Sequence, residues 1–135
     1  KHPEVFDPAV NPYAVRVVIT GSRPAPSAFG EFPHFISFDG FIDVEYTPEQ
    51  LERVALISEP FCRYAKWKGG PEPLPAQEKQ VIEQLIAKSH KAGKPIRFWC
   101  SPDNAVAWET FRKLGIDIIN TDQPEACTLY FQQNP

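Results

Sequence analysis

Residues 78–101 read EKQVIEQLIAKSHKAGKPIRFWCS, and this stretch decides the fold class. A helix is predicted over 78–92, because apolar side chains recur there at the three- and four-residue spacing of one helix face. These side chains are Val81, Ile82, Leu85 and Ile86. Gly93 stops the helix, and the apolar run 95–101 then predicts a buried strand. A helix followed by a buried strand is the repeating unit of parallel β/α proteins.

The same alternation extends along the rest of the chain. Strands are expected at 14–20, 34–40, 60–67, 95–101 and 116–122. Further helices are expected from Thr47, over 105–114 and over 125–132. The helix at Thr47 begins with a capping box and continues through the apolar stripe Leu51, Val54, Ala55 and Ile57. Loops are expected where proline and glycine cluster, at 1–12, 21–33 and 69–75, and three prolines argue against a helix in 21–33.

Polar residues near the predicted strand ends bear on the type of sheet. They are Ser37, Asp39, Lys66, Arg97, Ser101, Asn120 and Asp122. A doubly wound sheet is covered on both faces and has almost wholly apolar strands, whereas a barrel carries polar groups at its active-site mouth. A complete barrel needs about 250 residues. The five predicted strands fit the last five strands of such a barrel or a small flavodoxin-like sheet. The polar strand ends favour (β/α) units of the TIM-barrel type, with residues 1–135 as a single segment.

The composition of the chain disfavours several classes of protein. The chain has 135 residues, of which 42% are hydrophobic and 13% aromatic, enough apolar surface to support a core. Its net charge of -3 disfavours nucleic acid as a partner. No apolar run approaches the roughly 18 residues of a transmembrane segment. The chain contains no Met and opens with Lys1-His2-Pro3-Glu4, so we expect a piece of a longer protein or a processed product.

The cysteines Cys62, Cys100 and Cys127 are odd in number and widely spaced, which does not indicate a disulfide framework. Neither they nor the three histidines have the spacing of a zinc site. Each cysteine is therefore expected to be a small buried apolar residue. The cysteines alone do not indicate whether the protein occupies an oxidising or a reducing compartment.

The most specific motifs are GKPIRFWCSPDN at 93–104 and LGIDIINTD at 114–122. They resemble the end of the glycerophosphodiester phosphodiesterase and phosphatidylinositol-specific phospholipase C-like superfamily. In that superfamily a strand with a Trp precedes a polar turn ending in Asn, and the last strand ends in Thr-Asp. The segments ISFDG at 36–40, YTPEQL at 46–51 and YAKW at 64–67 resemble a secreted bacterial branch of it. The resemblance covers roughly 14–130. It implies that the five predicted strands are strands 4–8 of an eight-stranded parallel barrel and that residues 1–135 belong to its carboxyl-terminal part.

This resemblance implies a phosphoric diester hydrolase that acts on a glycerophosphodiester or phosphoinositide-like substrate. Paired histidines would serve as general acid and base, with a divalent metal, Ca or Mg, as cofactor. No motif for these histidines or metal ligands is found in this sequence, so the catalytic and metal-binding residues are expected in the remainder of the barrel. The segment alone is predicted to be inactive. The expected partner is a small-molecule or lipid head-group phosphodiester, and the resemblance implies a periplasmic or secreted location.

Four residues are candidates for substrate binding within that framework. Lys66, at a predicted strand end, and Arg23, in the loop after the first strand, could contact phosphate, although both could equally be solvated surface cations. Trp99 could form a wall for the head group or could be a core Trp. Asp39 could bind a hydroxyl group or position Lys66, or could begin a turn before Gly40. Asp122 is expected to cap the last helix rather than to act as a catalytic acid.

Two alternatives remain beside the hydrolase. Another TIM-barrel enzyme, such as an aldolase or a glycosidase, is disfavoured because no Schiff-base Lys context and no paired Glu at strand ends are found. An autonomous small α/β binding domain without catalytic activity would be favoured if the chain folded alone as a stable monomer. A part of a barrel would instead expose open strand edges, which invite pairing with another copy.

Overall fold

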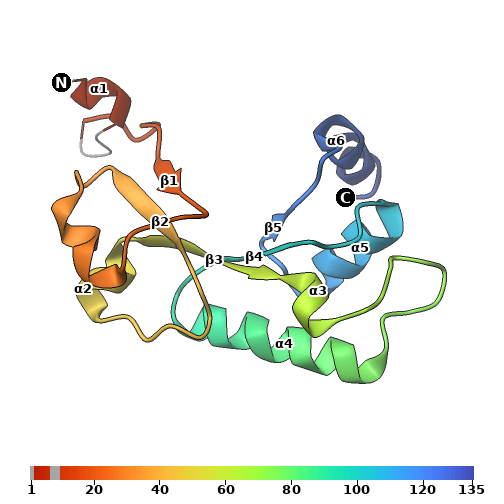
Figure 1. Ribbon diagram of the computed structural model, residues 1–135. Helices are drawn as coiled ribbons and strands as arrows, with labels where there is room; N and C mark the ends of the chain where they lie inside the picture. Colours follow the sequence, from red (N-terminus) through yellow and green to blue (C-terminus); the bar gives the residue numbers. More distant parts are fainter. Residues whose placement is uncertain (1, 7–9) are drawn as a thin grey trace. The chain divides into compact units, whose positions relative to one another are not determined.

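The computed structural model describes residues 2–6 and 10–135. In this part of the chain five strands are hydrogen-bonded in sequence order, β1-β2-β3-β4-β5 (Figure 1). They are β1 (Val17–Ile19), β2 (Ile36–Gly40), β3 (Val54–Pro60), β4 (Ile96–Trp99) and β5 (Ile118–Ile119). β1 is parallel to β2, β3 to β4, and β4 to β5. A doubly wound sheet reverses its strand order at a switch point. The sequential order is instead compatible with part of a TIM-barrel-like unit.

The helices occupy most of the connections between the strands. They are α1 (Pro3–Phe6), the 3₁₀ helix η1 (Pro26–Glu31), α2 (Pro48–Glu52), α3 (Phe61–Tyr64), α4 (Ala76–Lys91), α5 (Ala105–Leu114) and α6 (Pro124–Gln133). The contacts divide the chain into two compact units, Lys1–Leu56 and Ile57–Pro135. Each unit is described by itself below.

The first unit is built on the β1–β2 pair. Its register runs from Val17 beside Ile36 to Ile19 beside Phe38. Phe38 is fully buried, and its ring stacks on Phe29 of η1 with 4.0 Å between the ring centroids. This aromatic pair forms the core on one face of β2. Ser37 and Asp39 lie on the other face, because successive side chains of a strand point to opposite faces.

The segment after the second strand is the main error of the sequence prediction. The Thr47 capping box is confirmed: the Thr47 hydroxyl accepts from the Gln50 amide, and the Gln50 side chain accepts from the Thr47 amide. The helix, however, ends at Glu52, and the expected apolar stripe through Val54, Ala55 and Ile57 belongs to β3. The first four residues of β3 are all apolar and two of them, Val54 and Ile57, are β-branched, which suits a buried strand and outweighs their helical spacing.

The third strand was consequently predicted too late in the chain. Residues 60–67 do not form a strand: β3 ends at Pro60, and Phe61–Tyr64 is the short helix α3. The buried run from Ile57 to Glu59 supplies the strand instead. Lys66 therefore follows α3 rather than ending a strand.

Two predicted loops contain short helices. Residues 21–33 include η1, because Pro26 occupies its first position, where the missing N–H has no intrahelical acceptor to lose. The predicted loop 1–12 includes α1. Lys1 and residues 7–9 of that loop lie outside the described residues.

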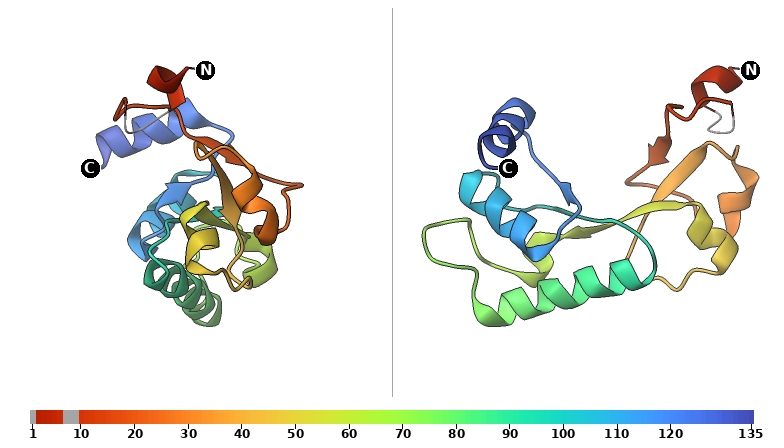
Figure 2. Two further views of the ribbon diagram at one scale, coloured as in Figure 1. Left: turned by 90° about the vertical axis from the view of Figure 1, so that its left-hand side faces the viewer. Right: turned by 180° about the vertical axis from the view of Figure 1, so that it is seen from behind.

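The second unit has an aromatic core between β4 and the helices beside it. The α4 helix packs against α3 and β4 (Figure 2). Phe61 of α3 contacts Phe98 and Phe111 edge-on, with 6.1 Å and 5.3 Å between ring centroids. The strands predicted at 95–101 and 116–122 are confirmed in shorter form, as β4 and β5.

The ends of the two predicted amphipathic helices are confirmed. Gly93 follows the C-cap of α4 and has a φ of 69°. The Asn104 side chain caps α5 by accepting from the Ala107 amide at 3.0 Å. Gly115 ends α5 with a φ of 83°, a left-handed conformation that favours glycine.

Candidate functional site

A buried ion pair lies at the carboxyl ends of β1 and β2 in the first unit. The Arg23 Nη1 donates to Asp39 Oδ1 at 2.7 Å, and the Thr20 hydroxyl donates to Asp39 Oδ2 at 2.6 Å. Only 9% of the Arg23 side chain and 7% of the Asp39 side chain are exposed. Both carboxylate oxygens of Asp39 are thus engaged by neighbouring donors.

The local sequence brings these groups together. The β1–β2 register ends with Ile19 beside Phe38, so the next residues along the strands, Thr20 and Asp39, are neighbours on the opposite face. Gly21 follows with a φ of 72°, and the Arg23 amide donates to the Gly21 carbonyl at 2.9 Å. This tight turn returns Arg23 to the strand end.

Arg23 has a buried nitrogen that has no acceptor. Its Nη2 is buried and makes no hydrogen bond with any described residue. Its Cζ lies 3.6 Å from the centroid of the Phe41 ring, which fixes the plane of the guanidinium by a cation–π contact. A buried donor left without an acceptor costs about 1–3 kcal/mol. An oxyanion is the acceptor that matches a guanidinium best.

The other two predicted substrate residues lie in the second unit. Lys66 is exposed and makes no hydrogen bond or ion pair with a described residue. Trp99 ends β4 beside Pro60 of β3 and is 44% exposed, so it is not a core Trp. The core tryptophans are Trp67 and Trp108. The structure thus brings Arg23 and Asp39 into contact, and it leaves Lys66 and Trp99 as accessible side chains.

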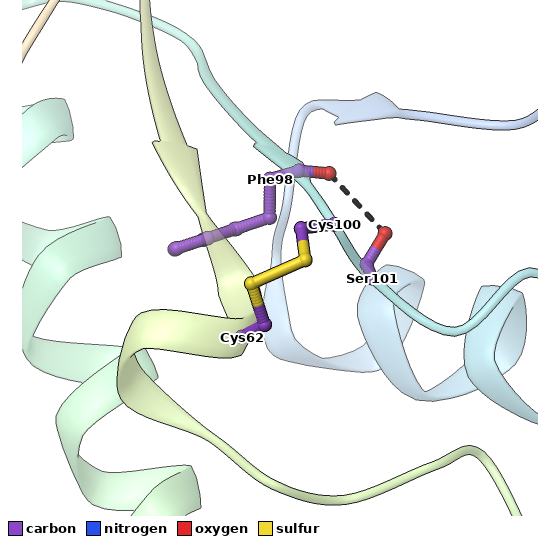
Figure 3. Close-up of a disulfide and its surroundings, with 4 residues drawn as sticks. All are labelled: Cys62, Phe98, Cys100 and Ser101. Carbon is purple, nitrogen blue, oxygen red and sulfur yellow. Dashed lines mark hydrogen bonds between the residues drawn. A yellow bond between two sulfur atoms is a disulfide. The ribbon is translucent and has the colours of Figure 1, made fainter.

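Cys62 and Cys100 form a disulfide, which corrects the prediction that both are buried apolar residues (Figure 3). The bond joins α3, directly after β3, to the residue directly after β4. The Ser101 hydroxyl donates to the Phe98 carbonyl at 3.3 Å in the same turn. The third cysteine, Cys127, is free and buried, as predicted, and burial raises the pKa of its thiol.

Asp103 organises the loops that follow β4 and β5. Its carboxylate accepts from the Trp108 indole N–H at 2.8 Å and from the Asp122 amide at 2.9 Å. Burial raises the pKa of Asp103, but the hydrogen bonds to its carboxylate outweigh burial and lower the pKa below its ordinary value. Asp122 is not the helix cap that the sequence predicts: Gln123 is the N-cap of α6.

Two buried polar residues of β3 are not singled out by the sequence analysis. Ser58 accepts from Arg97, its register partner on β4, at 3.2 Å from Nε and 2.8 Å from Nη2. Glu59 is buried, and its carboxylate accepts from the Tyr64 hydroxyl at 2.9 Å. The strand predicted from the sequence begins only at residue 60, so neither Ser58 nor Glu59 is predicted to lie on a strand.

The described residues do not fit a resident metal. No group of three or more His, Cys, Asp or Glu side chains among residues 2–6 and 10–135 could hold one. No step of the chemistry is therefore derived through a metal. No helix in the described part of the chain is long and apolar enough to cross a membrane.

Comparisons with models of protein families, with curated proteins and with solved structures found no match to this chain.

Proposed function

We propose that this chain is the substrate-facing part of a phosphoric diester hydrolase, with β1 to β5 as strands 4–8 of a (β/α)8 barrel. The observation that carries the proposal is the unpaired Nη2 of buried Arg23 at the carboxyl ends of β1 and β2. Carboxyl ends of parallel strands are where barrel enzymes place their substrates. The proposed substrate is a glycerophosphodiester or a phosphoinositide-like molecule.

Each step of phosphate recognition follows from the contacts of Arg23. Asp39 accepts from Nη1 and Phe41 covers one face of the guanidinium, and Nη2 is left buried without an acceptor. A non-bridging phosphoryl oxygen would accept a hydrogen bond from this nitrogen. Because Nη2 is buried before the substrate arrives, binding would require a local opening that exposes it, whereas the ion pair with Asp39 could stay in place.

The remaining roles follow the resemblance described above. Lys66 would supply a second positive charge, and the exposed ring of Trp99 would form a wall for the head group. The histidines and the divalent metal of the resemblance would come from the remainder of the barrel. The disulfide supports a periplasmic or secreted location, since such bonds persist in oxidising compartments.

Calorimetric titration with sn-glycero-3-phosphocholine tests this proposal. We expect saturable binding without turnover of bis(p-nitrophenyl) phosphate. Arg23→Lys keeps a charge beside Asp39 but loses the fork of donors, so it should weaken binding about tenfold to a hundredfold. Arg112→Lys is the matched control, because Arg112 forms an exposed ion pair with Glu109 and should leave binding unchanged.

Three outcomes would count against the proposal. Equal affinity for acetate would make the site a general anion site. Unchanged affinity of Arg23→Lys for sn-glycero-3-phosphocholine would show that Arg23 does not bind this ligand. Turnover that is abolished by a chelator would contradict the assignment of the catalytic groups to residues outside this chain.

An autonomous α/β binding domain is the second candidate. It is favoured by the aromatic core that residues 57–135 enclose by themselves, in which Phe61 contacts both Phe98 and Phe111. A cooperative melt together with no phosphodiester binding would support this candidate over the hydrolase.

A further inference from the structure

A pocket of about 320 Å³ adjoins the disulfide in the second unit. Its wall includes Phe61, Cys62, Ala65, Trp67, Lys68 and Cys100. The pocket is mainly apolar, with both disulfide cysteines and one lysine on its surface. No role in the proposed phosphodiester site uses these groups, so the pocket requires a separate account.

The disulfide in this wall is accessible from solvent. Cys62 and Cys100 are both exposed residues, in contrast to the buried free Cys127. Thiol–disulfide exchange requires that an incoming thiolate reach one of the two sulfurs. Exposed disulfides are accordingly the ones that exchange, whereas buried disulfides are protected.

The structure around the disulfide can persist after the bond is opened. The Trp67 amide donates to Glu78 at 3.1 Å, and the Trp67 indole donates to the Glu72 carbonyl at 2.8 Å. Gly69, with a φ of 72°, lies so close to the next loop that a Cβ would approach the Asn104 side chain to 2.8 Å. These contacts hold residues 67–70 in place without the disulfide.

Backbone conformation favours opening of the bond at Cys100. Its φ is 54°, and among the described residues no other non-glycine residue has a positive φ. A side chain in this left-handed region costs about 1–2 kcal/mol. Cleavage of the crosslink would let this residue relax.

Lys68 supplies a positive charge, which favours an anionic reactant at this pocket. It is exposed, lines the pocket, and makes no ion pair with a described residue. We propose that the pocket is a thiol–disulfide exchange site for a small anionic thiol, whose carboxylate pairs with Lys68 while its sulfur attacks the Cys62–Cys100 bond.

The chemistry balances with two equivalents of that thiol. The first thiolate forms a bond to one cysteine sulfur, the Cys62–Cys100 bond breaks, and the other cysteine leaves as a thiolate that takes a proton from water. A second thiolate attacks the mixed disulfide and releases the first cysteine in the same way. The protein disulfide is reduced by two electrons, and the small thiol is oxidised to its own disulfide.

The test measures exchange rates by intact mass after alkylation under native conditions. Glutathione is the anionic probe and 2-mercaptoethanol the neutral one, compared at equal thiolate concentration. We expect Lys68→Gln to slow the reaction with glutathione about threefold to fivefold and to leave the reaction with 2-mercaptoethanol unchanged. Salt at about 1 M should remove the difference. Lys91→Gln is the control, because this exposed lysine at the end of α4 does not line the pocket.

Several results would overturn the proposal. Two alkylated cysteines before any thiol is added would show that the disulfide is not formed. If Lys68→Gln reacts with glutathione at the same rate as the native protein, the charge of Lys68 does not select the thiol. Alkylation of buried Cys127 at the same rate as the other two would show that the thiol acts on unfolded protein rather than at a local site.

Discussion

The carboxyl ends of β1 and β2 are organised by charge, whereas those of β3 and β4 are organised by a covalent bond and exposed side chains. In the first region the Thr20 hydroxyl and the Arg23 guanidinium both donate to the buried Asp39 carboxylate, and the buried Arg23 Nη2 has no acceptor. In the second, Cys62 is bonded to Cys100, and Lys68 stands in solvent at the pocket edge. Neighbouring strand ends can thus present either a buried ion pair or an exposed cation beside a disulfide.

Removal of the Asp39 carboxylate is expected to have the largest effect on stability. Asp39→Ala leaves Arg23 buried without its counter-ion, and we expect a loss of about 3–5 kcal/mol in the free energy of unfolding, measured with urea. Glu83→Ala is the control, because its ion pair with Lys79 is exposed and should contribute less than about 0.5 kcal/mol. Equal losses in the two variants would mean that charge does not organise the first region.

Removal of the disulfide should rank second. Cys62 and Cys100 are 38 residues apart, and closing a loop of this size stabilises a protein by about 2–4 kcal/mol. The double variant Cys62→Ala/Cys100→Ala should lose that amount in urea unfolding. If it unfolds at the same urea concentration as the native protein, the covalent bond does not organise the second region.

Asp103→Ala probes the hydrogen bonds that support the second region. The buried Trp108 indole N–H would lose its acceptor, and we expect a loss of about 1–2 kcal/mol. Asp103→Asn is the conservative control, because it keeps an acceptor oxygen and should lose less. The two variants are compared by urea unfolding near neutral pH. If both are as stable as the native protein, Asp103 does not support this region.

The smallest expected effect is the acid dependence of Asp117. Burial raises the pKa of Asp117, but hydrogen bonds from His90 and the Ile96 amide lower it below its ordinary value. A carboxyl group with a lower pKa in the folded state stabilises the protein above its unfolded pKa, and this contribution is lost as the pH falls through the folded pKa. Solvent screening limits the effect to about 0.5 kcal/mol.

Urea unfolding between about pH 6 and pH 3 measures this contribution. Asp117→Asn should show a shallower loss of stability with acid than the native protein does. Identical pH profiles would rule out the contribution of Asp117.

Features with local causes were predictable from the sequence. The helices at 76–91 and 105–114 follow from apolar spacing and from Gly93 and Gly115, which end them. The β3 strand was missed because its apolar residues at 54–57 continue the spacing of the preceding helix, and only tertiary burial separates the two.

The candidate site was predictable residue by residue but not as a set of contacts. The sequence predicts Asp39 at a strand end and Arg23 in the loop after the first strand, but their ion pair depends on the β1–β2 register and the turn at Gly21. The disulfide was missed for the same reason, because proximity of residues 38 positions apart is a tertiary property.

An amide NMR titration with sn-glycero-3-phosphocholine tests the central claim most directly. The account predicts saturable shifts that begin at Thr20, Arg23 and the residues from Asp39 to Phe41, and that disappear in Arg23→Lys but persist in Arg112→Lys. No saturable shift at these residues, or the same shifts in Arg23→Lys, would contradict the assignment of the first region as a phosphodiester site.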